Sequence, residues 1–177
     1  MAARSLPTTP TFAANSELTS TQLTALVTYQ LFWSSPPCFR AEQHTAQAVT
    51  TSTNTQITCE TTIHDSDSGL SVATPYSYVI PFAGIWNIGG GYGCTGNGTG
   101  VRIPLLYQNG TVINGCQPEY TPVSSSAVYE VAAMGLPCNV GDVIALYGYQ
   151  TSGSTLNTTL GPEASWFAGQ LVSLQNP

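Results

Sequence analysis

The chain has 177 residues, a net charge of −6 and a pI near 4.4, and arginine provides its only strong cations because lysine is absent. Charged residues make up 7% of the sequence, against roughly a quarter in an ordinary soluble domain. This composition excludes a basic nucleic-acid surface, a polybasic membrane contact and a phosphate loop of the Gly-Lys type, so no nucleic-acid partner is expected. With 42% hydrophobic and 10% aromatic residues, the chain has enough apolar side chains for one compact domain.

The start of the chain has neither a leader pattern nor a membrane-spanning pattern. Met1-Ala2-Ala3-Arg4 precedes a stretch rich in Pro and Thr rather than an apolar run. No window approaches the ~20 apolar residues of a transmembrane helix. The sequence therefore predicts a protein made in the cytoplasm, with no membrane insertion.

Residues 1–18 predict an extended arm, and the one convincing helix follows it. Thr19 and Gln22 have the spacing of a capping box. Apolar side chains then recur at steps of three and four residues, which places them in one stripe. They are Leu23, Leu26, Val27 and Leu31. Pro36-Pro37 ends the helix, so residues 1–37 are predicted to be an attachment or oligomerisation unit. The stripe would pack on its own domain, on a symmetry mate or on another protein.

From Cys38 onward the helical period disappears, and Val, Ile, Thr and Tyr dominate between Gly, Pro and Asn-Gly breaks. Strands are expected at 38–50, 54–63, 75–80, 84–94, 99–108, 111–120, 125–134, 142–150 and 164–174. A series of short strands after one helix predicts an all-β fold, an antiparallel β-sandwich of two sheets that occupies residues 38–177.

Local patterns refine this sandwich. Pro104 cannot donate a ladder hydrogen bond, so its strand should lie at an edge or be bulged there. Asn109-Gly110 predicts a hairpin turn with positive φ. Glycines 89–91 should let a backbone or a ring approach closely, because no helix follows them to form a phosphate site. One row is expected to face inward on the strand at 142–150. It consists of Val143, Ala145, Tyr147 and Tyr149.

No cofactor and no catalytic apparatus are predicted. The five cysteines have no zinc-binding spacing; buried thiols are the favoured interpretation, and one or two disulfides are the alternative. His64 and Asp65 are adjacent on an expected strand and so point to opposite faces. A Ser-His-Asp site that uses His64 stays open only as an alternative. Asp65 and Asp67 alternate as in a calcium loop, but the downstream glutamate is missing. A solvated turn is therefore favoured, with calcium as the alternative.

Several motifs follow one another in the order of strands of a known fold. They are Pro81-Phe82-Ala83-Gly84-Ile85-Trp86, Gly100-Val101-Arg102-Ile103, Tyr107-Gln108-Asn109-Gly110-Thr111, Asn139-Val140-Gly141-Asp142-Val143-Ile144-Ala145-Leu146 and Ser165-Trp166-Phe167-Ala168-Gly169-Gln170-Leu171. In this order they resemble the jelly rolls of the complement type and the tumour-necrosis-factor type. The resemblance implies a jelly-roll sandwich and a homotrimer, packed around an axis through an aromatic-rich sheet face. The candidates for trimer or core positions are Trp86, Tyr147, Tyr149 and Phe167.

The front of the chain carries a second resemblance. An arm, Leu18-Thr19, Gln22-Leu23, an apolar helix and Pro36-Pro37 follow each other as in small structural proteins of tailed bacteriophages, where a short N-terminal helix precedes the same jelly roll. This implies a non-enzymatic virion protein that the arm and helix dock to other virion proteins. The favoured function is a trimeric minor tail or tail-tip protein that contributes to host attachment through a surface glycan or protein. The alternatives are a capsid decoration or head-fibre protein, and a free secreted lectin-like trimer.

Overall fold

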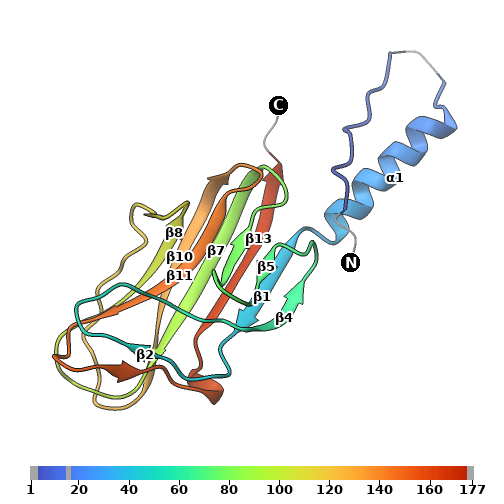
Figure 1. Cartoon of the computed structure of the whole chain (residues 1–177). Helices are drawn as coiled ribbons and strands as arrows, with labels where there is room; N and C mark the ends of the chain where they lie inside the picture. Colours follow the sequence, from blue (N-terminus) through green and yellow to red (C-terminus); the bar gives the residue numbers. More distant parts are fainter. Residues whose placement is uncertain (1–3, 15–16, 175–177) are drawn as a thin grey trace.

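The computed structural model describes residues 4–14 and 17–174. Within these ranges the chain forms one α-helix followed by a series of short and long strands (Figure 1). The elements are α1 (Ser20–Ser34), β1 (Cys38–Glu42), β2 (Ala48–Val49), β3 (Thr55–Gln56), β4 (Thr61–Asp65), β5 (Leu70–Ser71), β6 (Ser77–Val79), β7 (Gly84–Cys94), β8 (Arg102–Gln108), β9 (Thr111–Val112), β10 (Ala127–Cys138), β11 (Val143–Gln150), β12 (Leu156–Asn157), the 3-10 turn η1 (Gly161–Glu163) and β13 (Trp166–Leu174). No helix among these described residues is long and apolar enough to cross a membrane.

The strands form a sandwich of two antiparallel sheets. One sheet has the order β10-β7-β13-β1-β4, and the other has the order β5-β6-β11-β8-β9 with β3 added alongside β11. A small pair, β12-β2, lies outside both. The first and last long strands, β1 and β13, pair with each other, so the sandwich is closed by strands from opposite ends of the chain. The expected all-β sandwich is therefore present.

A single core cluster lies between the sheets and is rich in aromatic rings. The rings of Phe39 and Tyr78 stack with centroids 3.8 Å apart, and Phe39 also contacts Phe167 at 4.9 Å. Trp86 is fully buried, and its indole N–H donates to the carbonyl of Phe82 at 3.1 Å. Two of the four aromatic candidates, Trp86 and Phe167, are thus core residues of one chain.

The helix begins and ends close to where its sequence signals place it. Thr19 is the N-cap and forms the full capping box with Gln22, and the C-cap is Ser35, directly before Pro36-Pro37. The turn at Asn109-Gly110 has positive φ at both residues, 51° and 78°, as expected for the hairpin. At Pro104 the strand β8 pairs only with β11, since β9 reaches no further than Tyr107 and Gln108. The strand is therefore an edge strand at the proline.

The strand boundaries differ from the sequence prediction in several places. Residues 111–120 form only the two-residue β9, because a turn at Gly115, with a φ of 80°, interrupts the pairing with β8. The pairing resumes only as an isolated bridge between Tyr120 and Arg102. In contrast, β10 continues to Cys138, beyond the predicted end at 134. Gly135 lies in a β-bulge, where the register between β10 and β7 shifts. Pro137 is tolerated because β10 is an edge strand. The short strands β5 and β12 have no counterpart in the prediction.

The inward row predicted on β11 is wrong. The buried row is Ile144, Leu146, Gly148 and Gln150, whereas Tyr147 and Tyr149 are half-buried on the outer face. Gln150 is satisfied in the interior, since its amide donates to the carbonyls of Val49 at 3.0 Å and Ser154 at 2.7 Å. A polar residue that is hydrogen-bonded internally can lie on the core face. Gln150 does so, and the face of β11 that hydropathy alone indicates as buried is therefore the outer one.

The glycine run lies on β7 and allows the close approach that the sequence predicts. A Cβ at Gly91 would collide with the Trp166 indole and the Val128 side chain, and one at Gly90 would collide with Leu146. The five cysteines are all free thiols, and four of them are buried. Burial raises the pKa of Cys59 and of Cys138 to about 12, so these two thiols are kept in their neutral, unreactive form.

Candidate functional site

The arm and the helix form a stalk that projects from one end of the sandwich. We define the stalk as the described arm residues 4–14 together with α1. In Figure 1 the helix points away from both sheets, and the arm runs alongside it. The amide of Gln22 on the first turn of the helix donates to the carbonyl of Thr11 at 3.2 Å, which ties the far part of the arm to the helix start. The stalk is therefore a two-segment unit rather than a bare helix.

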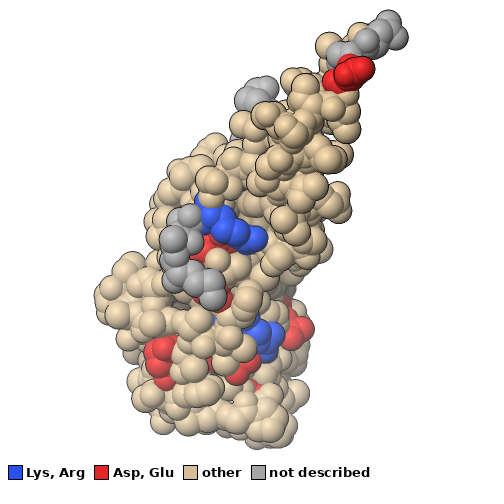
Figure 2. Space-filling model, turned by 90° about the vertical axis from the view of Figure 1, so that its right-hand side faces the viewer, with Lys and Arg blue, Asp and Glu red and all other residues tan. Residues whose placement is uncertain are grey.

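Apart from Arg4 at its base, the stalk is uncharged, and it exposes apolar side chains. Between residues 5 and 37 the only charged residue is Glu17, and Figure 2 shows a projecting part that is almost wholly free of charge, with acidic atoms only at its far end. The helical stripe is largely exposed: Leu23 is 49% exposed, Leu26 41%, Val27 49% and Leu31 64%. The one buried helix residue is Phe32. Water alone is a poor environment for such a surface.

Phe32 joins the helix to the sandwich. Its ring makes an edge contact with Phe82 at 5.5 Å and another with Trp33 at 5.4 Å. Directly after the helix, the carbonyl of Pro37 accepts a hydrogen bond from the Leu171 N–H at 2.8 Å. These contacts fix the helix end on the sandwich, so the direction of the stalk is set by packing as well as by the chain connection.

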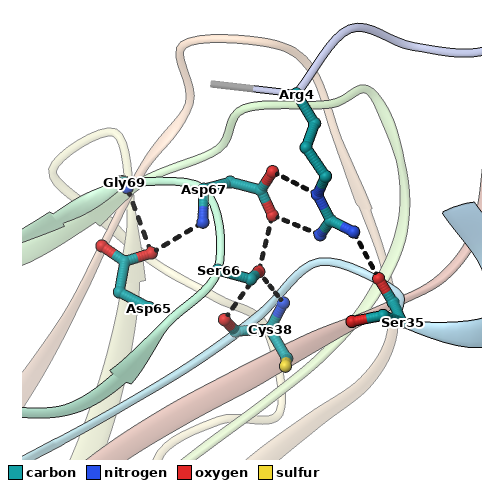
Figure 3. Close-up of polar contacts among 7 residues, drawn as sticks. All are labelled: Arg4, Ser35, Cys38, Asp65, Ser66, Asp67 and Gly69. Carbon is teal, nitrogen blue, oxygen red and sulfur yellow. Dashed lines mark hydrogen bonds and ion pairs between the residues drawn. The ribbon is translucent and has the colours of Figure 1, made fainter. Parts of the chain in front are cut away.

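A polar cluster centred on Arg4 fastens the arm to the same junction (Figure 3). The guanidinium donates to both carboxylate oxygens of Asp67, at 2.9 and 2.7 Å, and to the carbonyl of Ser35 at 2.5 Å. It also lies 5.4 Å from the centre of the Phe32 ring. Ser66 completes the cluster: its hydroxyl donates to Asp67 at 2.6 Å and accepts from the Cys38 N–H at 2.9 Å. One arginine thus connects the arm, the helix end and the loop after β4.

The Asp67 carboxylate is shielded from water, with a side-chain exposure of 0% against 30% for Arg4. Burial by itself would raise the pKa of Asp67, but the hydrogen bonds from Arg4 and Ser66 and the positive charge of Arg4 outweigh it. The pKa of Asp67 therefore lies below its usual value. The carboxylate is ionised near neutral pH and holds Arg4 in place.

The two aspartates considered for calcium point to different partners. Asp67 pairs with Arg4, whereas Asp65 accepts hydrogen bonds from the N–H groups of Asp67 and Gly69, both at 3.3 Å, and of Leu70 at 2.9 Å. Within residues 4–14 and 17–174, no group of three or more His, Cys, Asp and Glu side chains is placed to hold a metal ion. This arrangement favours the turn that the sequence also suggested, with Asp65 as its backbone acceptor.

The outer face of the five-stranded sheet carries a shallow trough of about 450 Å³. Its floor is made of small residues, among them Gly89, Ala132 and Ala168, and Trp166 and Met134 stand beside it. Arg40 lies 5.3 Å from the centre of the Trp166 ring and pairs with Glu42. The glycine run contributes to this trough through Gly89 of β7, which has no side chain to fill it.

The outer face of the six-stranded sheet carries the other two aromatic candidates. The rings of Tyr107 and Tyr147 lie 4.2 Å apart, and the Tyr107 hydroxyl accepts from the Asn54 amide at 2.7 Å. Tyr149 is half-buried on the same face. Burial raises the pKa of Tyr147, and the neighbouring Tyr107 raises it further. These rings are held in place by one another and are accessible from outside the chain.

The two histidines are exposed and do not lie in a catalytic arrangement. His64 on β4 lies opposite Arg40 on β1 in the strand register. The carboxylate of the neighbouring Asp65 accepts a hydrogen bond from the backbone of its own loop. His44 lies 3.8 Å from Glu42. The geometry of His64 and Asp65 agrees with the expectation that adjacent strand residues point to opposite faces.

Comparison with known proteins supports the fold. No family model matches the chain, and no curated protein matches it in sequence. Among solved structures, the PRD1 vertex protein P5 is similar, with a TM-score of 0.56 and 11% identity over 78% of this chain and 98% of that one. The Eiger TNF of S. frugiperda has a TM-score of 0.48 and 13% identity over 80% of this chain and 96% of that one. The fold is a jelly-roll β-sandwich, as the sequence motifs predicted.

Sequence reasoning missed the role of Arg4 and the trough beside Trp166. The only signal for the first was that Arg4 is the one cation of the predicted arm, residues 1–18. The partner itself lies 63 residues away and could not be identified from spacing. The trough depends on which residues of five strands face outward in one row, and that requires the pairing register.

Proposed function

We propose that this protein is a non-enzymatic structural component of a bacteriophage virion, which displays a trimeric jelly roll on an attachment stalk. Within the virion, the favoured position is a minor tail or tail-tip site where the jelly roll contributes to host attachment. The observation that carries the proposal is the stalk. Its apolar side chains are largely exposed, and its junction with the sandwich is fastened by packing and by the Arg4–Asp67 pair. A surface of this kind fits permanent burial in an assembly.

The homotrimer is supported by the outer face of the five-stranded sheet. This face has a floor of small residues and exposes Met134, whose side chain is 71% accessible. Flat backbone beside large apolar side chains allows close packing of a neighbouring copy. Light scattering on the purified full chain should give about three times the 18.6 kDa chain mass. A monomer mass at micromolar concentration would refute the trimer.

A charge on this face tests which surface the copies share. Met134→Glu should lower the assembly mass, because it places a carboxylate in the proposed interface at a position exposed in the single chain, where folding tolerates it. Val140→Glu is the matched control, since Val140 is 67% exposed in the turn between β10 and β11. Equal masses for both variants would exclude this face. The Tyr107, Tyr147 and Tyr149 surface would then be the next candidate.

The outer tyrosines of the six-stranded sheet suit host contact. Tyrosine supplies rigid, amphipathic contact area at low entropic cost, and Tyr107 and Tyr147 are already held together by mutual packing. Particles that carry Tyr147→Ala should assemble normally and adsorb to host cells more slowly. Normal adsorption with this variant would remove the tyrosine face from the proposal, and loss of assembly would assign it to the particle instead.

A position on the capsid is the second candidate, and the likeness to a vertex protein favours it. Mass spectrometry of purified particles tests whether the chain is a virion component at all. Electron microscopy of particles labelled with an antibody against the jelly roll then separates the two positions. Signal at the tail tip supports the favoured position, whereas signal confined to the head supports capsid decoration. A chain absent from particles but present in the medium would support the free, secreted lectin-like trimer.

A further inference from the structure

The helix of the stalk has two different faces, and the arm of the same chain covers only one of them. Arm residues 5–8 and the helix residues Ser20, Thr21, Thr24, Ala25 and Thr28 line a shared groove of about 510 Å³. Hydroxyl groups on this face bond back to the helix, as Thr24 does to the Ser20 carbonyl at 2.9 Å. The arm is thus placed along the threonine face, and Leu31 adjoins it near the helix end, where it lines a second groove with Arg4, Ser5 and Pro7. Leu23, Leu26 and Val27 line neither groove.

The uncovered face has heptad spacing. Leu23 and Gln30 are seven residues apart, and so are Leu26 and Trp33, which gives two successive a and d positions. Val27 flanks this seam and is 49% exposed. Trp33 lies at the base of the helix, where it packs partly against the core of the sandwich. Such a seam is the pattern by which helices pack side by side.

The absence of charge indicates what covers this seam. Residues Ser20–Ser34 contain no Asp, Glu, Lys, Arg or His. In a parallel assembly of identical chains, equivalent seam positions lie opposite one another, so a charge at one of them would face a like charge. An uncharged helix avoids this repulsion. Gln30 then lies in the middle of the seam, where a polar residue can pair with its own copies and fix the register.

We propose that α1 is a self-association element, in which the faces formed by Leu23, Leu26, Val27 and Gln30 pack in parallel between copies of this chain. This inference rests on the homotrimer proposed above and names the partner of the helix within it. The parallel direction follows from the junction, since every helix leaves the same end of its jelly roll and is fixed there by Phe32. The far end of the stalk, where Phe12 is 50% exposed and the adjoining Leu18 is 58% exposed, is left free to dock on the particle.

A helix of two heptads is too short to associate alone, so the test uses the full chain. Leu26→Cys should form a disulfide between copies under mild oxidation, because facing seam positions bring their Cα atoms within disulfide range. Thr24→Cys is the matched control on the face that the arm covers, and it should give no more linked product than the wild-type chain. The native thiols provide that background, and Cys38 is the only one of them that is not buried. Equal linkage for both variants, or none for Leu26→Cys, would overturn the inference.

A second variant keeps the inference testable without new thiols. Leu23→Ser together with Leu26→Ser should raise the concentration at which the assembly dissociates by at least tenfold in sedimentation experiments, whereas Val140→Ser should not. An unchanged dissociation concentration would refute the role of the helix while the trimer itself stands. A wild-type chain that is monomeric would refute both the trimer and this inference. The presence of the chain in particles is measured separately, so failure of the virion role is recognised on its own.

Discussion

The sandwich buries its large apolar side chains, whereas the stalk exposes most of its own. In the sandwich, Trp86, Ile144 and Leu146 are almost completely buried between two sheets. In the stalk, Phe32 is the one buried residue of the helix, although the helix contains as many large apolar side chains as a core strand. The sandwich is therefore stabilised by its own packing, whereas the stalk has little internal packing beyond its junction. The difference indicates that the stalk is built for contacts that other chains supply.

The largest predicted loss of stability is for a substitution in the core of the sandwich. Trp86→Ala should lower the free energy of unfolding by about 3–5 kcal/mol, because it leaves a large cavity and removes the hydrogen bond to Phe82. Phe12→Ala in the arm, where the ring is half-exposed, should change it by less than about 0.5 kcal/mol. Urea unfolding followed by fluorescence or circular dichroism measures both. Similar losses for the two variants would mean that the arm is part of the folding unit.

The next effect concerns the close approach of backbones in the sandwich. Gly93→Ala places a Cβ against the carbonyl oxygen of Glu163, which is backbone and cannot rotate away. The cost should be about 2–3 kcal/mol. Gly98→Ala is the control, since no atom lies within 4 Å of its Cβ. It should be neutral in the same urea titration, and a neutral Gly93→Ala would show that the loop around Glu163 can move aside.

These glycines also illustrate what can be predicted from sequence and what cannot. The run from Gly89 to Gly93 contradicts ordinary strand preference, so a close approach could be expected there from composition alone. The ring and the carbonyl that approach are contributed by Trp166 and Glu163, 70 or more residues later. Such partners follow from the pairing of β7 with β13, and local patterns do not determine it. The helix, in contrast, is specified by its own cap and by Pro36-Pro37, so its bounds could be predicted closely.

The reversed row on β11 has a related cause. Both faces of this strand carry apolar residues, since Ile144 and Ala145 are both buried, and the period of two then does not identify the core side. The polar residues Gln150 and Arg102, which are paired across β11 and β8, lie on the buried row. The two terminal nitrogens of Arg102 donate there to backbone carbonyls, including that of Asn97 at 2.6 Å. Internal hydrogen bonding of this kind is invisible to hydropathy, and it decided which face Tyr147 and Tyr149 occupy.

A smaller effect is predicted at the junction between the two regions. Arg4→Gln removes the charged partner of the buried Asp67 carboxylate and the bond to Ser35. The arm should then open more often, and hydrogen exchange of its amides should rise roughly tenfold, or by about 1.4 kcal/mol. Arg40→Gln is the matched control, because its pair with Glu42 is exposed on the outer sheet face. Unchanged exchange in Arg4→Gln would mean that packing alone holds the arm.

Acid should reproduce this opening in the wild-type chain. The pKa of Asp67 in the folded protein is lower than its usual value of 3.8. The ion pair therefore contributes its full stability above that value and loses it as the pH falls through the lower, folded pKa. Arm exchange, corrected for the intrinsic pH dependence of amides, should be constant from pH 7 to about pH 5 and rise only below about pH 4. In Arg4→Gln this acid step should be absent.

The smallest effect is expected at the helix start, and it tests whether the stalk has any stability of its own. Thr19→Ala removes the side-chain cap that accepts from the Gln22 N–H and leaves the returning bond from the Thr19 N–H to the Gln22 side chain as the only half of the box. Helix stability should fall by about 1 kcal/mol, seen as faster exchange in the first turn. Thr21→Ala should act in the opposite direction, because alanine has the higher helix propensity and Thr21 caps nothing. If copies of the chain pack along the seam of the helix, the loss of helix stability in Thr19→Ala should become smaller as the protein concentration rises. A loss that is independent of concentration would instead mark the helix as stable within the single chain.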